Sequence, residues 1–213
     1  MSRASSNDPA NRARWRAAWD RQASTYDRQM RFFDRTLFKD SRDWVCRQAT
    51  GDVLEVAIGT GLNLEHYPSG TRLTGIELSP GMLQLARDRS VELGVEVDLR
   101  EGDAHRLEFA DASFDTVVCT FSLCAIPDHR QAIAEMHRVL RPGGLLVLAD
   151  HVASPNPLGR VVQRLAEVVT VRVGGEHFLR RPLEVVQSEG LQIEQQERFG
   201  IGLVERLSAR RTD

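Results

Sequence analysis

Short apolar runs alternate with polar or amphipathic stretches along this 213-residue chain. Runs at 53–58, 72–77, 95–100, 113–120 and 145–149 have the length and continuity of strands buried in a parallel sheet. Helical patterns are expected from 62–67, from Ser79 onward and over 129–140. Strands that alternate with helices predict an α/β fold with a mainly parallel sheet.

Both ends of the chain add elements to this core. Near the amino terminus, a helical pattern from Ala10 places Trp15 and Trp19 four residues apart, and an aromatic helix is expected over 30–38. Near the carboxyl terminus, helices over 158–171 and 183–189 precede two last strands at 191–199 and 202–207. The total is therefore seven strands.

A glycine turn follows the first apolar run. Strand, glycine turn and helix form the place where an α/β sheet receives a nucleotide-like ligand, and glycine permits the tight turn and the close approach. A dinucleotide-binding G-x-G-x-x-G would require a third glycine where Leu64 stands. The sequence instead reads E-x-A-x-G-x-G, formed by Glu55, Ala57, Gly59 and Gly61.

Acidic residues end or follow the next two strands. Glu77 lies 18 residues past the first glycine, near the offset of about 20 residues at which a carboxylate binds ribose hydroxyls. Its two oxygens can accept from two vicinal O–H donors. Asp103, after the third strand, suits the exocyclic amine of adenine, and the Ala104 N–H suits a ring nitrogen. Leu78 and Met82 either flank the adenine ring or pack in the core.

Together, about residues 22–150 resemble the class I S-adenosylmethionine (SAM) methyltransferases of the type 11 group. Their motif I is E/D-x-G-x-G-x-G, and residues 138–144 closely match their R-x-L-K/R-P-G-G turn. Pieces such as 59–63 and 150–152 are most similar to the methyltransferase-like thiol methyltransferases. Phosphatidylethanolamine N-methyltransferases and quinone C-methyltransferases share the same framework.

The resemblance implies a Rossmann-like fold with a seven-stranded, mostly parallel sheet and helices on both faces. It also implies a helical lid or arm over residues 1–40, a SAM-binding domain over 41–213 and an acceptor-shaping insert near 154–182. The A-x-x-Y-D signature at 23–27 implies that a tyrosine of the lid reaches the cofactor. The expected SAM contacts are Tyr26, Glu55, Ala57, Gly59, Gly61, Asn63, Glu77, Leu78, Met82, Asp103, Ala104, Thr120 and Leu123.

Two histidines are candidates for acid–base chemistry. His151 follows the fifth strand, at the edge of the sheet that binds ligands, and His177 lies in the expected insert. A thiol acceptor is already partly ionised at neutral pH, whereas a phenol needs a positioned base. His151 is therefore predicted to orient the acceptor or act as a base, or else to be a satisfied histidine bonded to Asp150. No metal-ligand spacing is present, and no metal is expected.

Composition and charge bear on the cellular compartment and on membrane contact. The cysteines Cys46, Cys119 and Cys124 lack a C-x-x-C spacing, so we expect buried, reduced and inert thiols. Residues 1–50 hold 11 basic and 6 acidic residues, a net +5, so the tryptophan helix could lie on a membrane surface or cap a pocket. No run of 18 apolar residues and no signal-peptide pattern occurs, so we expect a cytoplasmic protein.

The leading hypothesis is a SAM-dependent methyltransferase of a small molecule, with a thiol favoured. The alternatives are a phosphatidylethanolamine N-methyltransferase and a quinone C-methyltransferase. From other classes come a nicotinamide-dependent oxidoreductase, against which Leu64 argues, and a non-catalytic SAM-binding protein. The remainder of the chain after residue 50 is acidic and lacks the N/D-P-P-Y/F motif, so no nucleic-acid partner is expected.

Overall fold

A seven-stranded sheet forms the centre of the computed structural model, which describes residues 9–173 and 177–212. The strand order is β3-β2-β1-β4-β5-β7-β6; β1 to β5 are parallel, and β7 is antiparallel to both of its neighbours. The strands are β1 (Asp52–Val56), β2 (Arg72–Glu77), β3 (Val97–Glu101), β4 (Phe114–Thr120), β5 (Leu140–His151), β6 (Gln192–Phe199) and β7 (Val204–Arg210). The predicted sheet is confirmed.

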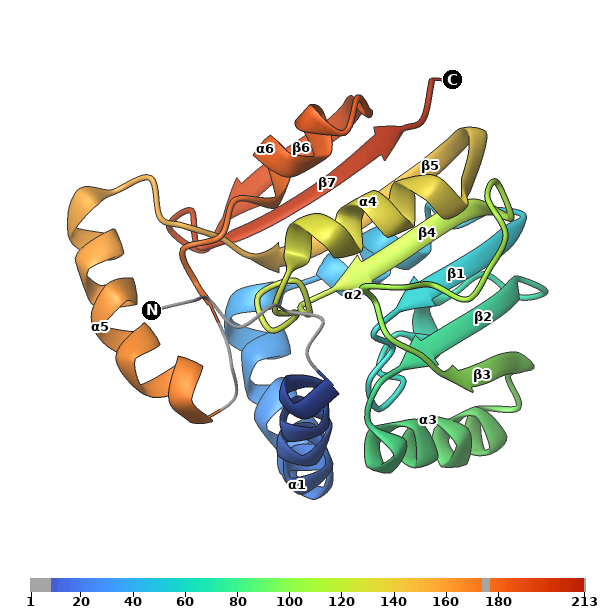
Figure 1. Ribbon diagram of the computed structural model, residues 1–213, viewed down its shortest axis with the longest axis horizontal. Coiled ribbons are helices and arrows are strands. Elements are labelled where there is room, and N and C mark those ends of the chain that lie inside the picture. Colours follow the sequence, from blue (N-terminus) through green and yellow to red (C-terminus); the bar gives the residue numbers. More distant parts are fainter. Residues whose placement is uncertain (1–8, 174–176, 213) are drawn as a thin grey trace.

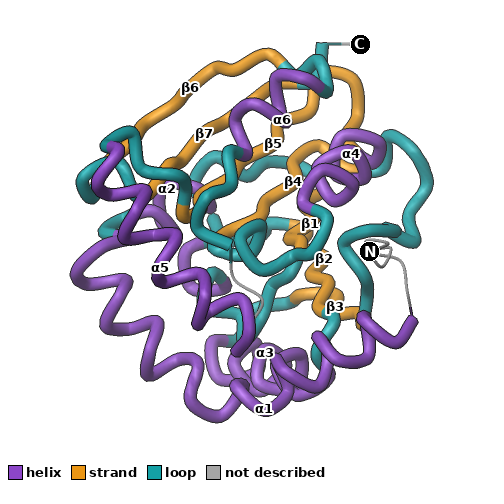
Figure 2. Tube along the Cα trace, turned by 60° about the vertical axis from the view of Figure 1, so that its left-hand side comes forward, coloured by secondary structure: helices purple, strands orange, loops and turns teal. Residues whose placement is uncertain are grey.

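Helices cover both faces of the sheet, as Figures 1 and 2 show. Helices α4 (His129–Val139) and α6 (Pro182–Ser188) pack on one face, and α2 (Ser41–Cys46) and α3 (Pro80–Leu93) pack on the other. Successive strand residues point to opposite faces. Val117 accordingly joins the cluster under α4, whereas Val118 joins the cluster under α3. The continuous apolar runs of the sequence therefore fill two cores at once.

The amino-terminal region differs from the prediction. The two expected helices form one helix, α1 (Pro9–Phe33), which continues into the π-helix η1 (Asp34–Phe38). No glycine or proline interrupts residues 10–38, so nothing in the sequence forces a break. α1 lies alongside α3 (Figure 2), at the carboxyl ends of the strands.

The prediction of a helix over 62–67 was also wrong about the type and length of the helix. Only a short 3-10 helix, η2 (Leu64–His66), forms there, because the residue before Pro68 is driven into an extended conformation. Tyr67 has ψ of 143° and ends the helix. Helix α2 has no counterpart among the predicted elements. The other element types are as expected and their boundaries shift, most of all in β5, which begins five residues before the predicted 145.

Helix α5 (Pro157–Val173) extends from the sheet on the side to which the arrows of β1 to β5 point (Figure 1). α1 lies on the same side, so the two helices flank the carboxyl ends of the parallel strands. Open α/β sheets bind ligands at this edge. Within the described parts of the chain, no helix has both the length and the apolar character that crossing a bilayer requires.

Candidate cofactor and acceptor site

A cavity lies at the carboxyl ends of the strands, beneath α1. Its walls come from α1, the glycine turn after β1, the end of β2, the loop after β3 and the loop after β4. Eight of the thirteen predicted cofactor contacts line it: Tyr26, Ala57, Gly59, Glu77, Leu78, Met82, Asp103 and Ala104. The structure brings these residues together from segments as far apart as residues 26 and 104.

The glycine turn leaves room for a ligand beside its backbone. Gly59 has φ of +60°, and a Cβ placed on it would meet no atom within 4 Å. The Ile58 N–H donates to the carbonyl of Ile76, which ties the turn to β2. Ala57, in place of the family's first glycine, also has a positive φ of 57°. This left-handed conformation costs an L-residue about 1–2 kcal/mol.

Backbone donors hold the carboxylate of Glu77 in place. One oxygen accepts from the Gly59 N–H at 3.1 Å, and the other accepts from the Ser79 N–H at 2.9 Å. Burial raises the pKa of this carboxyl, and the backbone hydrogen bonds oppose the rise. Each oxygen keeps a lone pair, so the group can still accept two hydroxyl donors from a ligand.

Asp103 is oriented by His105, which is not among the predicted site residues. Nδ1 of His105 lies 2.7 Å from Oδ1 of Asp103, and Nε2 of His105 accepts from the Asp128 N–H. This second bond leaves the ring proton on Nδ1, which donates to the carboxylate. Burial alone would raise the pKa of Asp103, but the bonds from His105 hold it below its usual value. A histidine two residues after the acid was the available signal.

Polar contacts fasten α1 over this end of the sheet. Arg12 lies 3.4 Å from Asp103, and Arg16 pairs with Glu101 at 2.6 Å. Asp20 accepts from the Gly81 N–H at the start of α3. Further along α1, Asp27 accepts from Thr60 of the glycine turn and pairs with Arg89. Trp15 and Trp19 line the cavity, which agrees with the prediction that they cap a pocket.

The other five predicted cofactor residues lie behind the cavity wall. Asn63 donates to Oε1 of Glu55 and to Oγ1 of Thr120, both at 2.8 Å, and Tyr67 donates to the second oxygen of Glu55. Burial raises the pKa of Glu55 to about 7, although Tyr67 and the charge of Arg42 oppose the shift. Gly61 packs against Leu64 and Ala86, and Leu123 is fully buried in the core. This buried network supports the glycine turn from below.

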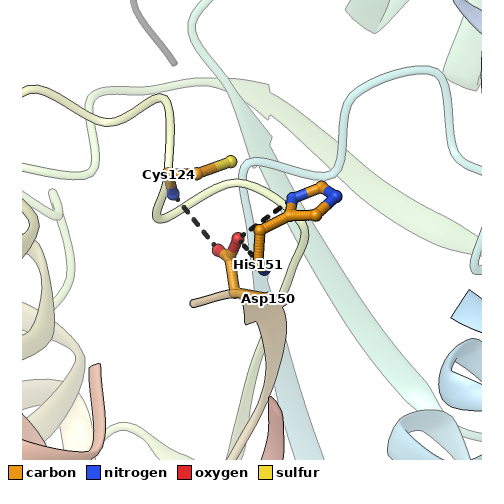
Figure 3. A group of neighbouring side chains, drawn as sticks. All are labelled: Cys124, Asp150 and His151. Carbon is orange, nitrogen blue, oxygen red and sulfur yellow. Dashed lines mark hydrogen bonds and ion pairs between the residues drawn. The ribbon is translucent and has the colours of Figure 1, made fainter. Parts of the chain in front are cut away.

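A second polar group lies at the ends of β4 and β5, where Cys124, Asp150 and His151 meet (Figure 3). The Asp150 carboxylate accepts from the backbone N–H of Cys124 and from that of His151. The His151 ring packs among the rings of Phe38, Phe121 and Phe178, and its Nδ1 has no hydrogen-bond partner among the described residues. Phe121 also lines the cavity, so this group borders the cavity wall.

His177 lies on the same side. Its backbone N–H donates to the carbonyl of Cys124 at 2.8 Å. Burial and the nearby charge of Arg180 lower the pKa of its imidazole, so the ring is neutral at pH 7. The structure thus places both predicted histidines beside the loop that follows β4. We call this region the β4–β5 end, and the region of Glu77, Asp103 and α1 the β1–β3 end.

The cavity residues fit SAM in their chemistry. Two carboxylates line the cavity, and the open backbone of Gly59 leaves room for the amino-acid part. The enclosed volume is about 90 Å³, below the roughly 300–1,000 Å³ typical of small-molecule pockets. Trp15, Trp19 and Tyr26 of α1 form one wall of this small cavity.

The strand order, the glycine turn and the acids after β2 and β3 define a Rossmann-like methyltransferase domain. Comparison with known proteins agrees: residues 54–148 match the family model described as a methyltransferase domain. A thiol S-methyltransferase of Rattus norvegicus is 31% identical over 170 residues, which are 76% of this chain and 70% of that protein. This chain belongs to the SAM-dependent methyltransferase family, and SAM is the cofactor that the family implies.

Two further relatives are informative. A phosphatidylethanolamine N-methyltransferase of Cereibacter sphaeroides is 43% identical over 119 residues, or 54% of this chain, which spans only 59% of that protein's length. A solved structure of a SAM-dependent methyltransferase from Thermotoga maritima has a TM-score of 0.67 at 22% identity, covering 92% of this chain and 99% of its own. The structural likeness establishes the shared fold.

Proposed function

We propose that this protein transfers a methyl group from SAM to a small-molecule acceptor, and that a thiol is the favoured acceptor. The carrying observation is the pair of carboxylates, Glu77 and Asp103, that face the open backbone of Gly59 in one cavity. That arrangement suits ribose hydroxyls, an adenine amine and an amino-acid tail in turn. We assign Glu77 to the ribose and Asp103 to the adenine.

SAM supplies an electrophilic methyl group on a sulfonium. The residues of the chain therefore have to align an acceptor in line with that methyl and exclude water. Trp15, Trp19 and Tyr26 of α1 close the cavity above the glycine turn. We propose that residues 1–40 act as the lid, which opens to admit the cofactor and closes for the reaction, and that residues 41–213 form the SAM-binding domain.

A thiol is favoured on three grounds. An unperturbed thiol has a pKa of about 8.5, so a few per cent is thiolate at neutral pH without a strong base. The rat relative that spans most of this chain is a thiol S-methyltransferase. The walls next to the β4–β5 end are mainly apolar, and include Phe121, Ala125 and Ile126.

His151 is the proposed residue for positioning or deprotonating the acceptor, with His177 as the second candidate. His151 borders the cavity through Phe121, and its Nδ1 makes no hydrogen bond to any described residue. Positioned general bases contribute about 10²–10⁴-fold to rate. We expect His151→Ala to lower kcat by about 100-fold while the affinity for S-adenosylhomocysteine stays within about twofold. Unchanged turnover removes His151 from the reaction.

The direct test is a screen of thiols, phenols, amines, quinols and phospholipids for release of S-adenosylhomocysteine. We expect thiols to give the highest kcat/KM. Calorimetry with S-adenosylhomocysteine and with NADH distinguishes the oxidoreductase, because only the former should bind. Binding of S-adenosylhomocysteine without turnover on any acceptor class would favour the non-catalytic SAM-binding protein.

A phospholipid N-methyltransferase is the second candidate, and α5 is the observation that favours it. This helix leaves Leu158, Val161, Val162, Leu165 and Val168 exposed. Arg160 and Arg164 add positive charge, and Glu167 is bonded to the Leu179 N–H. An apolar and basic helix face fits an anionic bilayer surface. In this alternative, α5 and not the tryptophan helix makes the peripheral membrane contact, and the proposed insert at 154–182 meets the lipid acceptor.

Co-sedimentation of the full chain with vesicles tests this candidate. Binding to phosphatidylglycerol-containing vesicles that falls at least fivefold in Leu165→Glu supports it. Val91→Glu, at an exposed valine on α3, is the matched control and should bind like the wild type. Absence of sedimentation, together with turnover on soluble thiols, rejects the phospholipid candidate.

A further inference from the structure

We infer that Cys124, Asp150 and His151 form a binding site for a zinc-class divalent metal ion. One possible ligand atom from each residue lies within 4.8 Å of the other two (Figure 3). Ligands around a tetrahedral zinc ion, at about 2.0–2.3 Å from the metal, are themselves about 3.3–3.7 Å apart. Side-chain shifts of about an ångström would therefore bring the three atoms around one ion.

Burial makes the grouping unusual. Cys124 and Asp150 are each 2% exposed, so neither ligand atom is a surface group that came near the others by chance. Nδ1 of His151 is a buried nitrogen with no hydrogen-bond partner within residues 9–173 and 177–212, and it lies 3.7 Å from Oδ1 of Asp150. A buried polar atom that lacks a partner is costly, and a bound ion is one of the few things that would satisfy it.

The surrounding bonds hold the ligands as metal sites require. Both oxygens of Asp150 receive a backbone N–H, at 3.2 Å and 2.7 Å, which fixes the carboxylate and leaves lone pairs on each oxygen. Arg180 donates to the carbonyls of Leu123, Ile126 and Pro127 and so clamps the loop that carries Cys124. A thiolate and a carboxylate together balance the two charges of the ion beside this arginine.

The ligand types select the metal. A soft thiolate, an imidazole and a single carboxylate favour Zn²⁺ over Mg²⁺ or Ca²⁺, which prefer oxygen. Three protein ligands also leave one of the four zinc positions open, as in catalytic zinc sites. The site borders the cavity through Phe121. Two further residues of the same loop, Ser122 and Ala125, lie on either side of Cys124 and also line the cavity.

The open position suits the thiol acceptor, a role that rests on the proposed function. A thiol that binds there loses its proton to solvent and stays as thiolate. The sulfur lone pair then forms the new bond to the methyl carbon. The bond from that carbon to the sulfonium breaks, and its electron pair remains on the sulfur of S-adenosylhomocysteine. No oxidant or reductant is needed.

Metal analysis of the full chain tests the site. Protein purified without a metal-affinity step is equilibrated with Zn²⁺, passed through gel filtration and assayed for zinc. We expect about one zinc per chain, and at least a tenfold loss of affinity in both Cys124→Ser and His151→Ala. Cys46→Ser, at another buried cysteine whose sulfur faces the Asn63 carbonyl, is the control and should keep the metal.

Cobalt substitution checks the ligand itself. A thiolate-to-Co²⁺ charge-transfer band should appear in the wild type and in Cys46→Ser and be absent from Cys124→Ser. Zinc at background level in the wild type, or equal zinc in Cys124→Ser, overturns the site. The two proposals fail separately: zinc binding without methyl transfer removes the function and keeps the site, whereas background zinc together with methyl transfer removes the site and keeps the function. Full turnover in zinc-free protein, with zinc binding intact, removes only the role of the ion in the reaction.

Discussion

The β1–β3 end and the β4–β5 end of this molecule lie on the same edge of one sheet, but their polar groups are satisfied, and their surfaces covered, to different degrees. At the β1–β3 end, each oxygen of Glu77 has a backbone donor, His105 orients Asp103, and α1 covers the cavity. At the β4–β5 end, a buried nitrogen of His151 lacks a hydrogen-bond partner among the residues that the structure describes, and Leu158 of α5 is 72% exposed.

This difference separates two tasks. A ligand of fixed structure is bound best by groups that are already in position, because little ordering is then required on binding. The β1–β3 end has that character and suits the cofactor. The β4–β5 end has a buried nitrogen without a hydrogen bond to any described residue, and exposed apolar side chains. Both features are expected of a site that is completed when a metal ion, an acceptor or a membrane binds. The zinc analysis and the His151 variant test the β4–β5 half of this contrast, and the following predictions test the β1–β3 half and the helix that covers it.

The largest effect is expected below the glycine turn, at Glu55. Its carboxyl has a pKa of about 7 in the folded chain against 4.5 when unfolded, so the unfolded chain loses the proton first as pH rises. Stability from this group is therefore full below pH 4.5 and falls by about 3 kcal/mol up to pH 7. We expect Glu55→Gln to match the wild type in free energy of unfolding at pH 4.5 and to exceed it at pH 8, as measured by urea unfolding.

A difference between the two proteins that does not change with pH would contradict this account of Glu55. The Gln side chain keeps an acceptor for Asn63 and a polar group for Tyr67, so the network itself should persist. Equal far-UV circular dichroism of both proteins provides the check on folding.

Removal of the charge at Glu77 should weaken cofactor binding most. Loss of charge-assisted hydrogen bonds costs about 1.5–3 kcal/mol, which is about 10–100-fold in affinity. We expect Glu77→Gln to raise the Kd for S-adenosylhomocysteine by this factor in calorimetry. Glu101→Gln, at the exposed end of β3, is the matched control and should change the Kd less than fivefold. Equal Kd values for Glu77→Gln and the wild type would remove the β1–β3 end as the cofactor site.

The sequence predicts the β1–β3 end well because its signals are local. The glycine turn directly follows β1, and Glu77 ends β2, so strand positions alone place these residues at one edge of the sheet. The same reasoning placed Asp103. It could not place α1, because Arg12 meets Asp103 across 91 residues and no local pattern encodes that contact.

The β4–β5 end was less predictable for the same physical reason. His151 was selected from its position after a strand, but Cys124 was expected to be inert. Its proximity to Asp150 depends on the pairing of β4 with β5 and on the fold of the loop between β4 and α4. Side-chain exposure on α5 also depends on what packs against the helix. An amphipathic pattern predicts the helix but does not indicate what its apolar face packs against.

A smaller effect is expected at Ala57, whose positive φ strains the turn. Glycine would relieve about 1–2 kcal/mol of strain and lose about 0.5–1 kcal/mol to the entropy of the unfolded chain. We expect Ala57→Gly to stabilise the protein by about 0.5–1 kcal/mol in urea unfolding. Ala112→Gly, at an exposed alanine with φ of 52°, should stabilise similarly and leave S-adenosylhomocysteine binding unchanged. Destabilisation by both substitutions would mean that neither alanine is strained.

The smallest effect concerns the fastening of α1. The side chains of Arg16 and Glu101 are 42% and 47% exposed, and exposed pairs contribute about 0.2–1 kcal/mol. A double-mutant cycle of Arg16→Ala and Glu101→Ala on the dissociation rate of S-adenosylhomocysteine should give a coupling in this range at low salt. The coupling should shrink at 1 M salt, because exposed charges are screened. A salt-independent coupling above 1 kcal/mol would show that α1 is part of the cofactor site itself and not only its cover, and the contrast between the two ends would then extend to the helix.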